Sequence, residues 1–345
     1  MSFHDKYPRV KKIASIEVPK PQAGELLVRV EAVALNPIDW KAHEWGISIA
    51  QYPAILGCEV SGVVVQVGPE VNNRAIGDVI AFQSYPGETG KGGFQQFAIV
   101  EAAVTFEVPS NMSHDEASTL PACALTAVHA FYTDYIPTHD IGGANLVPFW
   151  KEGGKYAGTP IVVFGGASSN GQFAIQLARL SGLSPIIATA SPHNEGLLKS
   201  LGATHVVNRN LTPTDLKSTI QEITSKPIQL IYDAIATEET QNLAYDVLKS
   251  GGKLLLALPS VIDQTKITSD KQVLHFVGKT YLPGLSAIDK EFYAVLPTYL
   301  KSGDIKPLIP ESLPGGLHSI SEGLGRLKRN ELTARKLIVH PTETI

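Results

Sequence analysis

The chain is poor in the residues that hold secreted proteins together. It has only two cysteines, Cys58 and Cys123, among 345 residues, which is too few for a disulfide framework and typical of a reducing compartment. The first twelve residues contain no apolar segment of the kind found in secretion signals. No apolar run approaches the ~20 residues that a membrane-spanning helix needs. These absences predict a soluble, cytoplasmic protein with no membrane partner.

An excess of positive charge is also missing. The sequence has 29 Lys and Arg against 33 Asp and Glu, for a net charge of −4, and no basic stripe stands out. This balance argues against a nucleic-acid partner. Apolar residues make up 43% of the chain and charged residues 18%, which is a globular composition. A chain of this length is long for one core and predicts two domains.

Two patterns of apolar residues divide the chain. The first ~120 residues carry short strand-like runs between turn residues, which favours a small barrel; these runs are 26–35, 58–67, 78–82 and 93–100. A helix is expected over 122–132, followed by a long loop at 134–159. From Pro160 strands alternate with helices, which predicts a parallel sheet covered on both faces.

The residue ranges of the expected strands and helices can be read from the sequence. The strands are 161–164, 185–190, 205–208, 228–234, 253–258 and 274–279, and the helices between them are 171–181, 193–201, 213–224 and 238–249. A helix at 288–302 contains Pro297, which predicts a kink or break there. Residues 336–340 form a last strand that could return to the N-terminal barrel.

The turn after the strand at 161–164 is the clearest functional signal. The apolar run meets Gly165 and Gly166, and a helical pattern begins near Gly171. Such a turn places a nucleotide pyrophosphate on the exposed amides of a helix start. The candidate contacts are Ser168, Ser169, Asn170 and Gly171. A strict G-x-G-x-x-G pattern is absent, so a purely structural turn is the alternative.

The next strand indicates which dinucleotide binds. An acid usually stands about 20 residues past the glycine turn to hold a ribose 2′-hydroxyl, but these positions are Ala190 and Ser191. The neighbourhood offers neutral donors and a cation instead, and these suit a 2′-phosphate: Ser191, His193, Asn194 and Arg209. We therefore favour NADPH over NADH. The tetrapeptide 191–194 also reads as a helix cap, which is compatible with anion binding.

Several motifs together resemble the medium-chain dehydrogenase/reductase superfamily. The likeness covers nearly the whole chain and is greatest to zinc-independent quinone-oxidoreductase-like members and fungal trans-acting enoyl reductases. It rests on ALNPIDWK (34–41), PAILGCEVSGVVVQVG (53–68), Gly77-Asp78, LPACALTAVHA (120–130) and SPHN (191–194). The resemblance implies the α/β fold class, with a GroES-like β-barrel domain at 1–122 and 303–345 and a Rossmann domain at 123–302.

The resemblance also implies site residues. Contacts near the nicotinamide would come from Ile38, Asp39, Lys41, Ala257 and Leu258, with residues 168–171 at the pyrophosphate. Thr333 and Ala334 would approach the cofactor from the returning C-terminal segment. In zinc alcohol dehydrogenases of the superfamily, a Cys, a His-Glu pair and a second Cys surround the metal. The corresponding positions here are Asn36, Cys58-Glu59 and Cys123. Two thiols with Glu59 or Asp39 leave a zinc site as an alternative, but we predict no metal.

Without zinc, conjugated acceptors are the natural substrates. Such a reductase must stabilise an enolate and protonate the α-carbon. The candidate donors are Lys41, Tyr52, Tyr85 and Tyr281; Lys41 could instead contact the ribose, and the tyrosines could be core residues. We predict an NADPH-dependent reductase of enones, enals, enoyl thioesters or quinones, acting on a small molecule or a carrier-bound acyl chain.

Three alternatives stay open at this point. The chain could be a zinc-dependent alcohol dehydrogenase. It could be a non-catalytic NADPH-binding sensor or partner protein. It could also act as a monomer or as a homodimer paired through the strand near 274–280.

Overall fold

The chain divides into two units, which are described separately. The computed structural model describes residues 11–47, 49, 52–87, 90–279, 282 and 284–345. The first unit comprises Met1–Ala122, Asp289–Gly303 and Pro307–Ile345, and the second comprises Cys123–Ile288 and Asp304–Lys306. The sequence-based division also has a boundary after residue 122, but it assigns residues 289–302 to the second domain.

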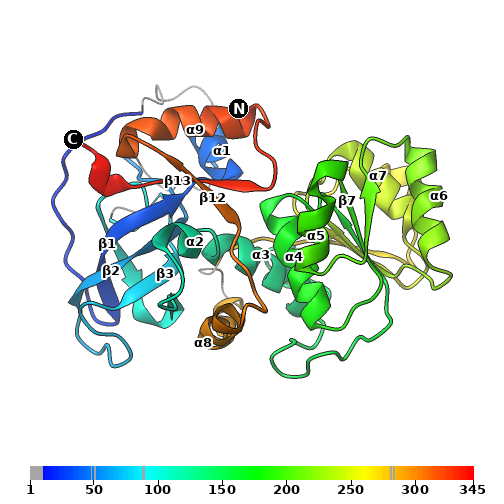
Figure 1. The fold of residues 1–345 in the computed structure, drawn as a ribbon, viewed down its shortest axis with the longest axis horizontal. Helices are drawn as coiled ribbons and strands as arrows, with labels where there is room; N and C mark the ends of the chain where they lie inside the picture. Colours follow the sequence, from blue (N-terminus) through cyan, green and yellow to red (C-terminus); the bar gives the residue numbers. More distant parts are fainter. Residues whose placement is uncertain (1–10, 48, 50–51, 88–89, 280–281, 283) are drawn as a thin grey trace. The chain divides into compact units, whose positions relative to one another are not determined.

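A mostly antiparallel sheet forms the first unit. Its strands run in the order β12-β13-β1-β2-β3-β5, and β4 pairs with β1 (Figure 1). The strands are β1 (Glu25–Ala34), β2 (Glu59–Val67), β3 (Val79–Gln83), β4 (Phe97–Glu101), β5 (Thr105–Glu107), β12 (Ile309–Leu313) and β13 (Arg335–Val339). The C-terminal strand β13 therefore returns to the N-terminal sheet, as the sequence suggested.

The core of this unit follows from alternation along the strands. Leu26, Val28 and Val30 of β1 are fully buried on one side of the strand, because successive residues of a strand point to opposite faces. They pack in one cluster with Phe82 of β3 and Leu337 of β13. Strands from both ends of the chain thus share one core.

Helices of the first unit differ most from expectation. They are α1 (Pro37–Trp45), α2 (His114–Ser118), α8 (Ser286–Ser302), which the division cuts at residue 289, and α9 (Ile320–Lys328); α3 (Pro121–Tyr132) begins here and continues into the second unit. Of the kink or break expected at Pro297, the break is wrong, because α8 runs through this residue, and the kink stays a prediction. Phe292, Leu296 and Leu300 of α8 are buried, and this packing compensates for the hydrogen bond that a proline removes.

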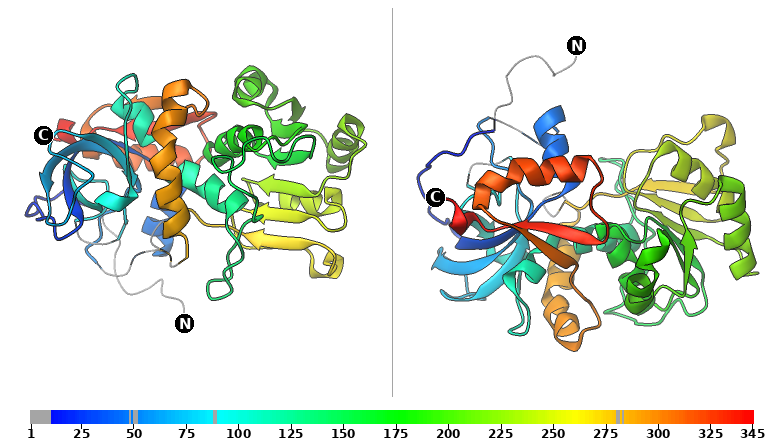
Figure 2. Two further views of the ribbon diagram at one scale, coloured as in Figure 1. Left: turned by 90° about the horizontal axis from the view of Figure 1, so that it is seen from below. Right: turned by 45° about the horizontal axis from the view of Figure 1, so that its top comes forward.

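A six-stranded parallel sheet forms the second unit. Its order is β11-β10-β9-β6-β7-β8, and Figure 2 shows these strands side by side. They are β6 (Ile161–Phe164), β7 (Ile186–Ala190), β8 (His205–Asn208), β9 (Leu230–Asp233), β10 (Lys253–Leu256) and β11 (Gln272–His275). All six strands lie within or close to the predicted segments. The doubly wound α/β prediction is confirmed.

Helices cover both faces of this sheet. Helices α4 (Ser169–Leu180) and α5 (Glu195–Leu201) lie on one face, and α6 (Pro213–Ile223) and α7 (Glu238–Val247) on the other (Figure 1). The order in which successive strands join the sheet therefore reverses between β6 and β9, which are parallel, hydrogen-bonded neighbours. In open parallel sheets, ligands bind outside the carboxyl ends of the strands at such a reversal.

No helix in the described part of the chain combines the length and the apolar character needed to span a membrane.

Candidate active site

The glycine turn lies at the reversal point of the second unit. Strand β6 ends at Phe164, and Gly165 follows with a φ of 73°. Ser168 then caps α4, because its side chain accepts a hydrogen bond from the Gly171 amide at 3.1 Å. The first amides of a helix have no acceptor within the helix. Those of Ser169 and Asn170 therefore have the geometry that an anion site at a helix start requires.

Close backbone approach gives this turn its shape. A Cβ on Gly171 would overlap the carbonyl oxygen of Gly165, and a Cβ on Gly166 would lie 2.9 Å from the Cβ of Ala188. Both glycines are thus required if α4 is to start so close to the strand end. The result is a cradle lined by backbone, which fits the pyrophosphate of a dinucleotide.

The neighbouring strand end holds a second loop beside the turn. Asp233 at the end of β9 is fully buried and accepts hydrogen bonds from the amides of Ile235 and Ala236 at 3.0 and 2.8 Å. Burial raises the pKa of this carboxyl. The side chain of Ile235 lies against Gly165. Asp233 therefore fixes a loop that forms one wall of the glycine turn.

The predicted phosphate residues gather at the ends of β7 and β8. Ser191 is half-buried, His193 is exposed and Asn194 is buried. Arg209 is exposed, and its amide donates to the carbonyl of Ala190 at 3.0 Å. The structure thus places the backbone of Arg209 directly beside the residue that precedes Ser191.

The predicted residues after β10 lie at the same edge of the sheet. The amide of Ala257 donates to the carbonyl of Asp233 at 3.1 Å. Leu258 is 40% exposed, Ile235 is 39% exposed and Val261 is 53% exposed. Three apolar side chains are therefore accessible in the loops after β9 and β10.

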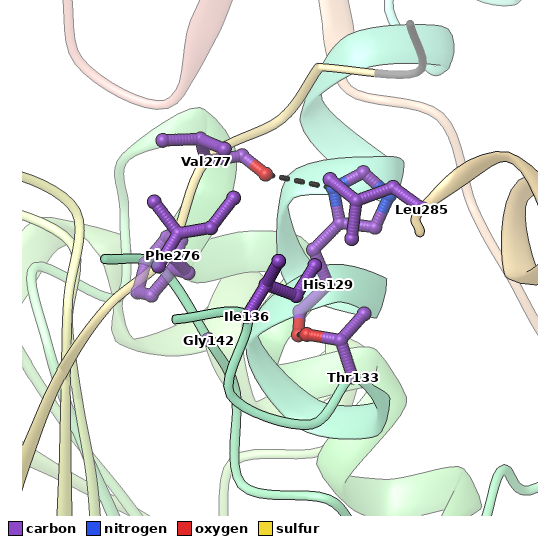
Figure 3. A pocket seen from close by; sticks show the side chains of 8 residues that line it. His129, Thr133, Ile136, Gly142, Phe276, Val277 and Leu285 are labelled. Atoms are coloured by element: carbon purple, nitrogen blue, oxygen red, sulfur yellow. Dashed lines mark hydrogen bonds between the residues drawn. The ribbon is translucent and has the colours of Figure 1, made fainter. Parts of the chain in front are cut away.

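A small pocket in the same unit adds no chemical group to this site. It is lined by His129, Thr133, Ile136, Ile141, Gly142, Phe276, Val277 and Leu285 (Figure 3). His129 is buried, and its Nδ1 donates to the carbonyl of Val277 at 2.7 Å. This histidine therefore anchors α3 to the segment after β11.

In the first unit, Asp39 organises the start of α1. Its carboxylate accepts hydrogen bonds from the amides of Asn36 and Gly57, at 2.8 and 3.1 Å. The residue is 1% exposed, and burial raises its pKa to about 7 against the opposing effect of these hydrogen bonds. The side chain predicted to contact the cofactor is thus directed into the protein.

Lys41 lies on the same helix in an aromatic setting. Its Nζ is 5.7 Å from the ring centroid of Trp40 and 5.8 Å from that of Trp45, within the range of cation–π attraction. Burial lowers the pKa of this ammonium. Ile38, one turn earlier on α1, is half-buried.

For the other predicted site residues the structure gives little beyond their exposure or backbone conformation. Tyr52 is 50% exposed, and Tyr281 lies outside the described residues. Thr333 is exposed, and Ala334 has a φ of 54° just before β13. The roles predicted for these residues stay predictions.

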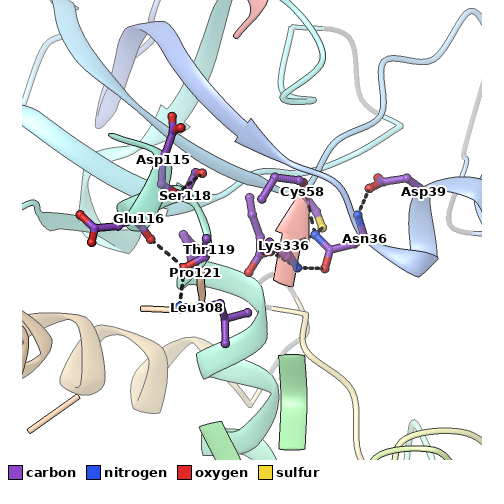
Figure 4. A network of polar contacts seen from close by, with 12 residues as sticks. Asn36, Asp39, Cys58, Asp115, Glu116, Ser118, Thr119, Pro121, Leu308 and Lys336 are labelled. Carbon is purple, nitrogen blue, oxygen red and sulfur yellow. Dashed lines mark hydrogen bonds and ion pairs between the residues drawn. The ribbon is translucent and has the colours of Figure 1, made fainter. Parts of the chain in front are cut away.

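A buried polar network in the first unit joins Asn36, Cys58 and Glu59, which the sequence named only as positions of the alternative zinc site, to Lys336, which it did not name as a site residue. Lys336 Nζ contacts Glu59 Oε2 at 2.7 Å and Asn36 Oδ1 at 2.5 Å. Asn36 Nδ2 donates to Glu59 Oε2 at 2.9 Å and to Cys58 Sγ at 3.3 Å. Figure 4 shows the side chains of Asn36, Cys58 and Lys336 converging. A glutamate and a lysine near the starts of two strands were the available signal.

These residues do not fit the zinc site of the superfamily. A lysine ammonium and an amide NH₂ occupy the neighbourhood of Cys58, and both are donors that repel a cation. No group of three or more His, Cys, Asp or Glu side chains suited to a metal exists within the described ranges.

Comparisons with known proteins agree with this architecture. Residues 22–110 match the alcohol dehydrogenase GroES-like domain, and residues 171–280 match the family named zinc-binding dehydrogenase. The trans-enoyl reductase himH of Aspergillus japonicus is 30% identical, over 91% of this chain and 89% of its own. The chain belongs to the medium-chain dehydrogenase/reductase superfamily. The predicted GroES-like and Rossmann domains are thereby confirmed.

Another curated relative and two solved structures are also similar to nearly the whole chain. The trans-enoyl reductase grgB of a Penicillium species is 28% identical over 94% of this chain and 93% of its own. An alcohol dehydrogenase superfamily protein from Novosphingobium aromaticivorans shares the fold, with a TM-score of 0.78, 23% identity and coverage of 95% and 94%. The CurK enoyl reductase does so with a TM-score of 0.72, 23% identity and the same coverage. Reductases of this superfamily bind a nicotinamide cofactor.

Gly171→Ala should weaken cofactor binding. The added methyl group would overlap the Gly165 carbonyl and displace the helix start from the strand. We expect the Kd for the dinucleotide to rise at least tenfold, or about 1.4 kcal/mol, in a fluorescence titration. Gly196→Ala is the control, because no atom lies within 4 Å of a Cβ there. Equal affinity of both variants would contradict the proposed cradle.

Asp39→Asn should change how stability depends on pH. Since the folded pKa is about 7 and the ordinary value is 3.8, the folded state binds the proton more tightly. This contribution to stability is complete below pH ~4 and is lost as the pH rises towards 7, by up to roughly 1.4 kcal/mol per pH unit. The variant should lose that slope in urea denaturation between pH 5 and 7.

Asp78→Asn serves as the comparison for Asp39→Asn. Asp78 accepts a single amide, that of Ala75, in an exposed turn. Between pH 5 and 7, the stability of Asp78→Asn should fall with pH as steeply as that of wild type. An unchanged slope of stability against pH in Asp39→Asn would refute the assignment of this slope to Asp39.

Proposed function

We propose that this chain is an NADPH-dependent, zinc-independent reductase of carbon–carbon double bonds conjugated to a carbonyl group. The observation that carries the proposal is the kinship with trans-enoyl reductases along nearly the whole chain. The acceptor would be an enone, enal, enoyl thioester or quinone. It would be a free small molecule or an acyl chain on a carrier.

The charge at the end of β7 supports NADPH. Ser191 and Asn194 are neutral, and the first carboxylate after the strand, that of Glu195, pairs with Lys199 at 2.7 Å. Arg209 stands beside this strand end, because its amide is bonded to Ala190. A guanidinium among neutral donors attracts a 2′-phosphate, whereas an acid here would repel it.

Each unit, taken by itself, carries residues that suit this chemistry. Bound NADPH supplies the reducing equivalents for the double bond. The amides at the start of α4 would hold the pyrophosphate, while the exposed apolar side chains Ile235 and Leu258 would exclude water from the nicotinamide side. Lys41 would donate a proton or stabilise the enolate oxygen, since its lowered pKa brings proton transfer closer to neutral pH.

Steady-state assays test the proposal directly. The purified chain is given NADPH or NADH with representative enones, enals, enoyl thioesters and quinones, and cofactor oxidation is followed. We expect turnover with at least one conjugated class and a preference for NADPH. Tight NADPH binding with no turnover of any class would reject the catalytic proposal.

Arg209→Glu should reverse the cofactor preference. The new carboxylate would repel a 2′-phosphate and could accept a hydrogen bond from a 2′-hydroxyl. We expect KM for NADPH to rise at least tenfold, which corresponds to about 1.4 kcal/mol, with a smaller change for NADH. Lys199→Glu makes the same charge change on α5 and should leave both KM values near wild type. If KM for NADPH rises equally in both variants, the effect comes from the change in net charge and not from a contact made by Arg209.

Lys41→Met should lower kcat. Loss of a positioned acid typically costs 10²–10⁴-fold, and we expect a decrease of at least ~10²-fold with little change in KM for NADPH. Lys328→Met is a matched control, because its Nζ also lies 5.8 Å from the Trp40 ring but pairs with Glu44. A rise in KM for NADPH with kcat unchanged would assign Lys41 to ribose contact.

A further inference from the structure

Three potential metal ligands meet at the ends of β1, β2 and β13. They are the thiol of Cys58, the carboxylate of Glu59 and the amide oxygen of Asn36. Sulfur and carboxylate oxygen are ligands that Zn²⁺ accepts. All three residues are buried, with 0% to 7% exposure. By donor chemistry alone, this pocket of the first unit could attract a divalent cation.

A protein cation already occupies the middle of this pocket. Lys336 is 3% exposed, and its Nζ lies 2.7 Å from Glu59 Oε2 and 2.5 Å from Asn36 Oδ1. The NH₂ group of Asn36 is directed at Cys58 Sγ and Glu59 Oε2. Cys58 Sγ, Glu59 Oε2 and Asn36 Oδ1 therefore each accept a hydrogen bond from Lys336 or Asn36. Figure 4 shows Asn36 between Cys58 and Lys336.

Strand register explains why the ammonium lies there. β1 and β13 are antiparallel, with Ala34 opposite Ile338, and continuing this register places Lys336 opposite Asn36. Glu59 lies opposite Ala34 on the other side of β1. The position of the lysine is thus set by the same backbone pairing that builds the sheet.

We infer that the Lys336 ammonium stands in for a divalent cation and closes this pocket to metal. A metal would have to bind beside a buried positive charge, where little water screens the repulsion. The lysine cannot easily leave, because it would abandon the buried charge of Glu59. The inference rests on the proposed zinc-independent function and gives it a structural cause. It concerns metal binding, so it can fail separately from catalysis.

Metal titration of the full-length chain tests this inference. Wild type, Lys336→Met and Lys328→Met are titrated with Co²⁺, and thiolate ligation is followed by its charge-transfer absorption. Zn²⁺ content is measured by elemental analysis after dialysis. We expect Lys336→Met to bind one equivalent at least tenfold more tightly than wild type. Lys328→Met, which loses a surface ion pair with Glu44, should behave as wild type.

Two further measurements keep the outcome decisive. Adding Cys58→Ser to Lys336→Met should abolish the cobalt–thiolate absorption, which assigns the metal to this pocket. Because Lys336→Met leaves Glu59 without its cation, this variant is also refolded with and without ZnCl₂. Recovery of folded protein only with zinc supports the inference, and failure in both conditions counts against it.

Opposite results would overturn the inference. One is wild-type protein that binds one equivalent of metal, with a Co²⁺ absorption that disappears in Cys58→Ser. The other is Lys336→Met that folds but binds metal no better than wild type. Activity of wild type in the presence of a chelator is recorded alongside. An inactive but metal-free wild type would refute the proposed function and leave the inference standing.

Discussion

The first unit depends on the buried ion pair between Lys336 and Glu59. The two charges lie on strands from opposite ends of the chain, and Asn36 bridges them from the end of a third. Removing one partner of such a pair typically costs about 3–5 kcal/mol, because the other charge remains buried. The pair therefore favours a single register of β13 and a single start for α1. The position of Lys41 on that helix follows from this constraint.

The second unit is constrained by sterics rather than by charge. The start of α4 approaches the end of β6 so closely that no side chain fits at Gly171. The same approach leaves unbonded amides pointing out from the helix start. Asp233 then holds the adjoining loop through two amide hydrogen bonds. The direction of these amides is thus a consequence of how strand, turn and helix pack.

Elements with a strong local pattern could be predicted from sequence. The strands at 161–164 and 205–208 were predicted to the residue, since β-branched apolar runs end at clear turn signals. Helix α1 was missed, because its nine residues carry almost no apolar periodicity and begin with proline. The helix at Pro297 does not break, which was one of the two outcomes predicted there, because tertiary packing along α8 outweighs the local preference.

In the candidate site, too, the sequence shows short-range patterns but not long-range contacts. The glycine turn and the missing acid after β7 are short-range patterns, so the sequence alone indicates them. The partnership of Glu59 with Lys336 spans 277 positions, and no local pattern reports it. Glu59 is the first residue of β2, and Lys336 directly follows Arg335 at the start of β13. A charge buried in a strand requires an opposite charge nearby, but the sequence does not distinguish a buried charge at the start of a strand from a solvated one. The contact between Glu59 and Lys336 therefore follows only from the fold that brings the two ends of the chain into one sheet.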